Sequence, residues 1–391
     1  MKKQENLDEL INIIRDLVAI PSYRGIVHQE RQTARYIHSL FQAEGIDSWL
    51  EEIEDGRENV IAHLPGKEGG KKLLLTGHLD TVPPYDMEDP LSMKCDETYL
   101  YGRGVVDMKG PLACMIYAMI LLKRNEEIPA CDLYFAGVID EEEKSLGTIA
   151  LLESEVTFDA AIVGEPTNLT IATAHRGLEW ITVDFIGKAV HGGAQEAGNN
   201  AIEMASDYIQ LLKEKLTPVV QAETHPLIGS SSYNLGKIEG GTQPSTVAGA
   251  CRLIIDRRWV PGVSHSEVMK QFQDILNHTL KNYPGASAKL EIMPESLMKE
   301  GYVHTPLDTS IDEDIVKVLQ HTVREVTGKE SKISSFPAWS DGGLLYTYAD
   351  VPTVVFAPGD LETAHAKEER IEISQLLPAV EIYLQLARYF G

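Results

Sequence analysis

The stretch that decides the fold is Leu73-Leu74-Leu75-Thr76-Gly77-His78-Leu79-Asp80. A short apolar run that ends in glycine and polar residues indicates a buried β-strand. Side chains two residues apart point to the same side of an extended segment, so His78 and Asp80 should lie together at the end of this strand. The Asp80 carboxylate could accept the second N–H of the imidazole and so fix the tautomer that binds a metal. Taken alone, such a pair is more often a structural hydrogen bond.

Four other stretches also place acidic or histidine side chains directly after an apolar run or a glycine-rich turn. They are residues 102–110 with Asp107, 139–143 with Glu141 and Glu142, 160–167 with Glu165, and 356–365 with Gly359 and His365. Because the carboxyl ends of strands in an open α/β sheet meet at one crevice, these side chains should converge. Each stretch has a plainer alternative, since Asp107 could cap a helix and an acidic run is usually a solvated surface.

The alternation of short β-rich runs with helical patterns predicts an α/β fold in which helices cover a sheet. Residues 59–64, 73–76, 133–139 and 160–163 read as strands, and 110–122 as a buried helix. From residue 178 the pattern of strand-like and helix-like runs changes to βαββαβ, which is typical of a small α+β, ferredoxin-like domain. We therefore predict one domain from residues 1–177 and 297–391, with an inserted domain at 178–296.

Composition narrows the classes of partner. The chain of 391 residues carries 59 acidic residues against 35 Lys and Arg, a formal charge of −24. Such a surface repels phosphate backbones and anionic lipids, so we expect neither nucleic acid nor a membrane as partner. The apolar runs look too short for a spanning helix. The first residues predict an amphipathic helix that begins with a capping box at Asn6 and Glu9, instead of a signal peptide.

The four cysteines predict a reducing compartment. Cys95, Cys114, Cys131 and Cys251 form neither a CxxC pair nor a compact disulfide framework, which indicates free thiols and a cytoplasmic protein.

The five polar stretches hold two histidines, several carboxylates and no thiolate. That donor set favours zinc, with cobalt or manganese as substitutes. It divides into one bridging Asp with one carboxylate and one imidazole for each of two metals, which leaves one further Glu as a base.

These motifs resemble those of the zinc-dependent aminoacylase and carboxypeptidase family, in the branch with acetylornithine deacetylase and succinyl-diaminopimelate desuccinylase. The resemblance runs from Pro21 to His365 in the family's order and implies a mixed-sheet, two-metal aminopeptidase-like catalytic domain. It implies that His78, Asp107 and Glu165 bind one zinc, that Asp107, Glu142 and His365 bind the other, that Glu141 is the general base, that Asp80 orients His78, and that the peptide bond after Asp107 is cis.

The resemblance also implies that the insert is a lid and dimerisation domain of a homodimer. His191 corresponds to a histidine that reaches the active site of the partner subunit and stabilises the oxyanion. Arg258 matches an arginine that holds a substrate carboxylate, for which a guanidinium is well shaped. Arg176, Ser245 and Gly359 are further candidate substrate-binding residues. Ser245 stands where many relatives have Asn, so a polar contact to the substrate is shortened or lost.

The predicted function is hydrolysis of the amide of an N-acyl amino acid, with a metal-bridging hydroxide and Glu141 as general base. A dipeptidase or carboxypeptidase would use the same metal chemistry, so the motifs leave that alternative open. From other classes, a binding protein that retains the fold and a purely structural interaction protein remain as alternatives. An intact Glu141 beside intact ligands argues against a mere binder.

Overall fold

The computed structural model describes residues 2–391. Its contacts divide the chain into two compact units. The first comprises the chain up to Ala174 together with Leu307–Gly391, and the second is His175–Pro306. The second unit thus starts three residues before the predicted position 178 and ends ten residues after the predicted position 296. Each unit has its own hydrophobic core.

In the first unit, the described residues form a mixed sheet of nine strands in the order β1, β2, β6, β3, β7, β17, β8 and β15, with β16 paired to β8. The strands are β1 (Asp47–Glu54), β2 (Arg57–Leu64), β3 (Lys72–His78), β6 (Asp132–Val138), β7 (Ala160–Val163), β8 (Ile171–His175), β15 (Leu307–Asp308), β16 (Ile333–Ser335) and β17 (Thr353–Val355). Strands β3, β6 and β7 pair in parallel, whereas β1, β2 and β6 pair antiparallel. The mixed-sheet prediction is confirmed.

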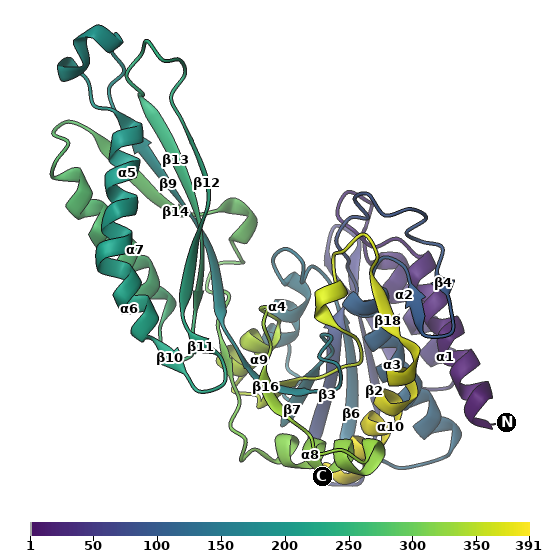
Figure 1. Ribbon diagram of the computed structural model, residues 1–391. Helices are drawn as coiled ribbons and strands as arrows, with labels where there is room; N and C mark the ends of the chain where they lie inside the picture. Colours follow the sequence, from purple (N-terminus) through teal and green to yellow (C-terminus); the bar gives the residue numbers. More distant parts are fainter. Residues whose placement is uncertain (1) are drawn as a thin grey trace. The chain divides into compact units, whose positions relative to one another are not determined.

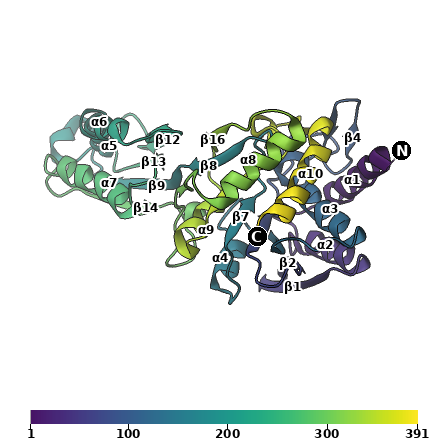
Figure 2. The same ribbon diagram turned by 90° about the horizontal axis from the view of Figure 1, so that it is seen from below.

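Helices cover both faces of this sheet (Figures 1 and 2). One face packs against α1 (Lys2–Ala19), α2 (Arg31–Ala43), α3 (Gly110–Arg124), α8 (Asp314–Thr327) and α10 (Ile373–Tyr389), and the other against α4 (Leu146–Glu153) and α9 (Gly342–Ala349). Leu73 and Leu75 pack into the core on the first face of this sheet and Leu74 into the core on its other face, as the alternation of side chains along a strand requires. Near the polar end, β18 (Arg370–Glu372), β5 (Tyr99–Tyr101) and β4 (Lys94–Cys95) form a small separate sheet.

Two local predictions were wrong. Helix α1 begins at Lys2, so Asn6 and Glu9 lie within it and form no capping box at its start. The segment Val105–Arg124 is long and apolar enough to cross a membrane by length and composition alone, contrary to the expected shortness of the apolar runs. Its most apolar stretch is 94% buried inside the protein, which is the pattern of a core helix. Tertiary packing explains its apolar composition.

The second unit has one antiparallel sheet in the order β12, β13, β9 and β14, with helices on one face (Figure 1). Its strands are β9 (Gly177–Ile186), β12 (Ser232–Gly240), β13 (Ala250–Trp259) and β14 (Ser287–Ile292), with a short hairpin of β10 (Thr224–His225) and β11 (Gly229–Ser230). Its helices are α5 (Ala201–Leu211), continued through Leu212–Leu216 into α6 (Thr217–Ala222), and α7 (His265–Leu280). A capping box of Ser264 and Glu267 starts α7. This strand order is that of a ferredoxin-like α+β sheet.

Candidate metal centre

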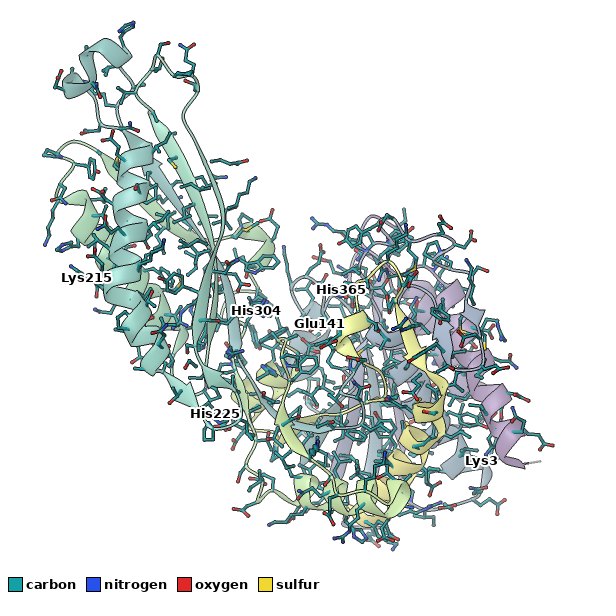
Figure 3. The ribbon with its side chains drawn as sticks, viewed as in Figure 1. Lys3, Glu141, Lys215, His225, His304 and His365 are labelled. Carbon is teal, nitrogen blue, oxygen red and sulfur yellow. The ribbon has the colours of Figure 1, made fainter. Side chains whose placement is uncertain are left out.

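Parallel strands deliver most of the predicted ligands to one edge of the first unit. His78 is the last residue of β3, the Glu141–Glu142 pair follows β6, and Glu165 follows β7. The fold brings them together because these three strands are neighbours that end at the same edge. Glu141 and His365 lie at this end of the unit in Figure 3.

Asp107 occupies the centre of the cluster. It lies in the irregular turn η1 (Val105–Lys109) just before α3, and the peptide bond to Met108 is cis. Its Oδ1 is 2.9 Å from His78 Nε2, and its Oδ2 is 3.1 Å from His365 Nε2. The two oxygens of one carboxylate therefore face two different imidazoles, which is the geometry that a bridging ligand needs.

Two sets of ligand atoms surround this bridge. One set consists of His78, Asp107 and Glu165, and the other of Asp107, Glu142 and His365; within each set the atoms lie within 4.8 Å of one another. His78 Nε2 is 3.6 Å from Glu165 Oε1, and His365 Nε2 is 3.1 Å from Glu142 Oε1. Glu165 Oε1 is buried without a hydrogen-bond partner, so it has a free lone pair where a cation would sit. The residues present fit two cations of the kind that the donor set favours.

Burial and neighbouring charges shift the titration of these groups. Burial would lower the pKa of His78, but the carboxylates of Glu165 and Asp107 raise it well above its usual value. Hydrogen bonds to Asp107 and Glu142 raise the pKa of His365 to about 10. Burial would raise the pKa of Asp107, yet hydrogen bonds from His365 and His78 lower it. In the metal-free chain, the protons on His78 and His365 thus provide the positive charge that bound cations would otherwise provide.

Glu141 is a carboxylate beside the ligands that belongs to neither set. Burial, followed by the charge of Glu165, raises its pKa well above the usual value, and the charge of His78 opposes this shift. Bound cations next to it would reverse that shift and keep it ionised at neutral pH. A carboxylate in this position can accept a proton and return it.

Asp80 acts differently from the expectation. His78 Nδ1 is 2.9 Å from the main-chain oxygen of Asp80, whereas the Asp80 carboxylate is 3.6 Å away. That carboxylate instead accepts the main-chain N–H groups of Glu141 and Glu142, at 3.2 and 3.1 Å. The backbone oxygen therefore orients the imidazole, and the side chain holds the turn that carries Glu141 and Glu142.

A buried ion-pair network that sequence reasoning missed supports the same turn. Asp140, with φ at +72°, precedes Glu141, and its Oδ1 accepts from Arg57 Nη2 at 2.7 Å. Arg57 also pairs with Glu30, and all three side chains are buried. The signal was an arginine in an otherwise buried strand, β2, because a guanidinium there must meet a carboxylate.

Gly359 is buried and packs closely against Val106 of η1. Its φ is +101°, and a Cβ at this position would come within 2.4 Å of Val106 Cγ2. Its N–H donates to Gln375 and its carbonyl oxygen accepts from Asn168 N–H. These contacts account for a glycine at this position through close packing.

The remaining predicted site residues belong to the second unit. Arg258 is paired with Asp256, at 2.8 Å between Nε and Oδ1. Arg176 donates to the carbonyl oxygens of Ile228 and Ser230, so its guanidinium holds the β10–β11 hairpin.

His191 and Ser245 come together at the far end of the same sheet. His191 is exposed and forms a β-bridge with Thr246, and the carbonyl oxygen of Ser245 accepts from Gly192 N–H at 2.7 Å. The sheet register aligns Arg258 with Leu178 and Ala250 with Ile186, so roughly 26 Å of strand lies between Arg258 and the end of the sheet that precedes the His191 loop.

Comparison with known proteins agrees with this architecture. Residues 74–389 match the model of peptidase family M20/M25/M40. An acetylornithine deacetylase from Aliivibrio salmonicida is 31% identical over 90% of each chain. An N-formyl-4-amino-5-aminomethyl-2-methylpyrimidine deformylase from Halalkalibacterium halodurans is 29% identical over 95% of this chain and 92% of that protein. A tripeptidase from Staphylococcus aureus has the same fold, with a TM-score of 0.81, 22% identity and 98% coverage of both chains. The chain therefore belongs to peptidase family M20/M25/M40 and is a hydrolase that acts on amide bonds.

Proposed function

We propose that this hydrolase cleaves the amide of an N-acyl amino acid, with two zinc ions and with Glu141 as its general base. The observation that carries the proposal is the Asp107 carboxylate, whose two oxygens face His78 and His365 while Glu141 lies beside both ligand sets. The relative at 31% identity is an acetylornithine deacetylase, which favours an acyl amino acid as substrate.

Each of the two ligand sets would hold one of the two zinc ions. His78 and Glu165 would hold one ion, Glu142 and His365 the other, and Asp107 both. When bound, two zinc ions supply positive charge that activates a water molecule and polarises the scissile carbonyl. Imidazole and carboxylate donors without thiolate support zinc, with cobalt or manganese as substitutes.

Glu141 moves the proton. Its carboxylate accepts a proton from the attacking water and returns it to the leaving amine, because that amine must be protonated to depart. The Asp80 carboxylate accepts the main-chain N–H of Glu141 and holds that main chain in place, so the base has a fixed starting position. Asp140 of the same turn pairs with Arg57 of β2, and this ion pair helps to hold that position.

The substrate would contact residues of the second unit from two copies of the chain. An arginine for the substrate carboxylate and a histidine for the oxyanion must both lie within a few ångströms of one small substrate. Arg258 and His191 stand at opposite ends of one sheet, so a single copy of this unit does not offer both to one substrate. This separation supports a homodimer in which the partner provides His191. The edge strand β12 is exposed along most of its length and open to pairing.

Mixing variants tests the shared site. Subunits with His191→Ala and subunits with Glu141→Gln should each be inactive alone, and mixed dimers should regain part of the activity, since one of their two sites is complete. Dimers that are verified as mixed and stay inactive would contradict a site built from two copies.

A substrate panel tests the reaction itself. The zinc-loaded chain should hydrolyse N-acetylornithine or N-succinyl-diaminopimelate with a higher kcat/KM than any dipeptide. Preference for dipeptides would favour a dipeptidase or carboxypeptidase of the same family. Two equivalents of bound zinc without turnover on any member of the panel would favour a binding protein.

The free thiols of all four cysteines support our further proposal that the enzyme is cytoplasmic.

A further inference from the structure

A buried ion pair lies directly behind Asp107. The side chains of Arg103 and Glu369 are 2% and 1% exposed, and Arg103 Nη1 is 2.5 Å from Glu369 Oε2. Neither residue belongs to the two ligand sets. Taking two charges out of water is costly, so a buried pair of this kind is weak support for stability by itself. The contacts of the pair indicate a different purpose.

Glu369 holds the main chain from which the Asp107 carboxylate projects. Its Oε1 accepts the N–H groups of Val106 and Asp107, at 3.0 and 3.2 Å. Asp107 departs from helical geometry, with φ at −125° and ψ at 91°, so a regular helix does not fix its main chain. The buried carboxylate does so instead, and its ion pair with Arg103 orients it.

The same pair joins the Asp107 segment to the His365 segment. Arg103 Nη2 is 3.4 Å from the carbonyl oxygen of Ala366, and Gly102 N–H donates to the carbonyl oxygen of Glu369 at 3.3 Å. These contacts connect residues that are more than 260 positions apart in the sequence. They hold the main chain on both sides of the 3.1 Å contact between Asp107 Oδ2 and His365 Nε2.

The two ligand sets differ in their need for such support. His78 lies in β3 and Glu165 directly follows β7, and the parallel pairing of these strands fixes their main chains. His365 lies outside the sheet, is half-exposed and has φ at +59°. Its position relative to Asp107 depends on contacts between loops.

We propose that Arg103 and Glu369 are a positioning pair for the second cation site, the one formed by Asp107, Glu142 and His365. The pair holds Asp107 against His365, so that site depends on it more strongly than the site of His78, Asp107 and Glu165. This inference rests on the proposed two-zinc function, and its test separates the two.

The test is a Zn²⁺ titration of the full-length, metal-free chain against a chromophoric chelator. In Glu369→Gln, the second equivalent of zinc should bind about 10 to 100 times more weakly than in the wild type, as is typical when a partner of a ligand is removed. The first equivalent should change much less. Loss of the second equivalent alone is a result that general destabilisation would not produce.

Glu223→Gln is the matched control. Glu223 also pairs with a fully buried arginine, Arg257, at 2.7 Å, but in the second unit. The same chemical change there should lower the Tm and leave both zinc affinities as in the wild type. If Glu369→Gln does not fold, Arg103→Lys and Arg103→Met replace it, and the lysine variant should keep more of the second affinity because it retains a cation.

Three results decide the matter. An unchanged second affinity in a folded Glu369→Gln chain would overturn the inference, and so would equal weakening of both equivalents. In both cases the wild type would still bind two zinc ions, and the proposed function would stand. A wild-type chain that binds fewer than two would overturn the two-zinc function, and the inference with it.

Discussion

The candidate residues of the two units are held in different ways. In the first unit, the candidate ligands face one another across 2.9 to 3.6 Å, and most of them are buried. In the second unit, Arg258 is occupied by Asp256 and His191 is exposed on a loop. The strand ends of the first unit thus preorganise a site before anything binds, whereas Arg258 of the second unit must leave Asp256 before it can bind a substrate.

Removal of the shared ligand should have the largest effect. Asp107→Ala deletes the only group that contributes to both ligand sets, so the chain should lose both zinc ions and all measurable turnover. Elemental analysis after dialysis and a hydrolysis assay measure the two losses. Asp86→Ala, which changes an exposed aspartate of the same unit, is the control and should keep two zinc ions. Full zinc content in Asp107→Ala would refute the bridge.

Glu141→Gln should come next in size. The amide cannot take up the proton of the attacking water, so kcat should fall by about 10²- to 10⁴-fold. Zinc content should remain at the wild-type level because Glu141 belongs to neither ligand set. Near-normal kcat in this variant would show that another group is the base.

Smaller effects are expected in the second unit, where they distinguish the two arginines. Arg258→Met should raise KM by roughly 10- to 100-fold if the guanidinium binds a substrate carboxylate, since a charge-assisted hydrogen bond is lost. Asp256→Asn should lower KM, because it frees Arg258 from its present partner.

Arg176→Met should lower the Tm and leave KM unchanged, because Arg176 holds backbone carbonyls. Equal KM changes in both arginine variants would erase the distinction.

The smallest effect concerns pH and follows from the imidazoles. An unfolded histidine has a pKa of about 6.5, and that of His365 in the metal-free fold is about 10. The native chain therefore binds more protons between these values, and the contribution of His365 to stability declines as pH rises through this window.

Zinc requires the neutral imidazole, so its affinity should rise through the same window. The difference in Tm between the zinc-loaded and the metal-free chain should widen from pH 6.5 to pH 9, and His365→Gln should reduce the slope. A constant or narrowing difference would count against this assignment of protons.

Strand ends explain how much of the site could be predicted from the sequence. His78, Glu142 and Glu165 follow apolar runs, and parallel pairing turns that linear pattern into a shared edge. The Arg103–Glu369 pair could not be found in this way, because its partners are 266 residues apart and meet only through loop packing. The hydrogen bonds of the Asp80 carboxylate could not be predicted for a related reason: spacing places a side chain on one side of the strand, but the N–H groups that this carboxylate accepts come from another loop.

The most direct test of the central claim is a crystal structure of the zinc-loaded chain with anomalous scattering measured at the zinc edge. We expect two peaks, about 3.5 to 4 Å apart as in other two-metal sites, with Asp107 bound to both. We expect His78 and Glu165 on one ion and Glu142 and His365 on the other. A single peak, or two peaks without a shared Asp107, would contradict the proposed two-zinc site.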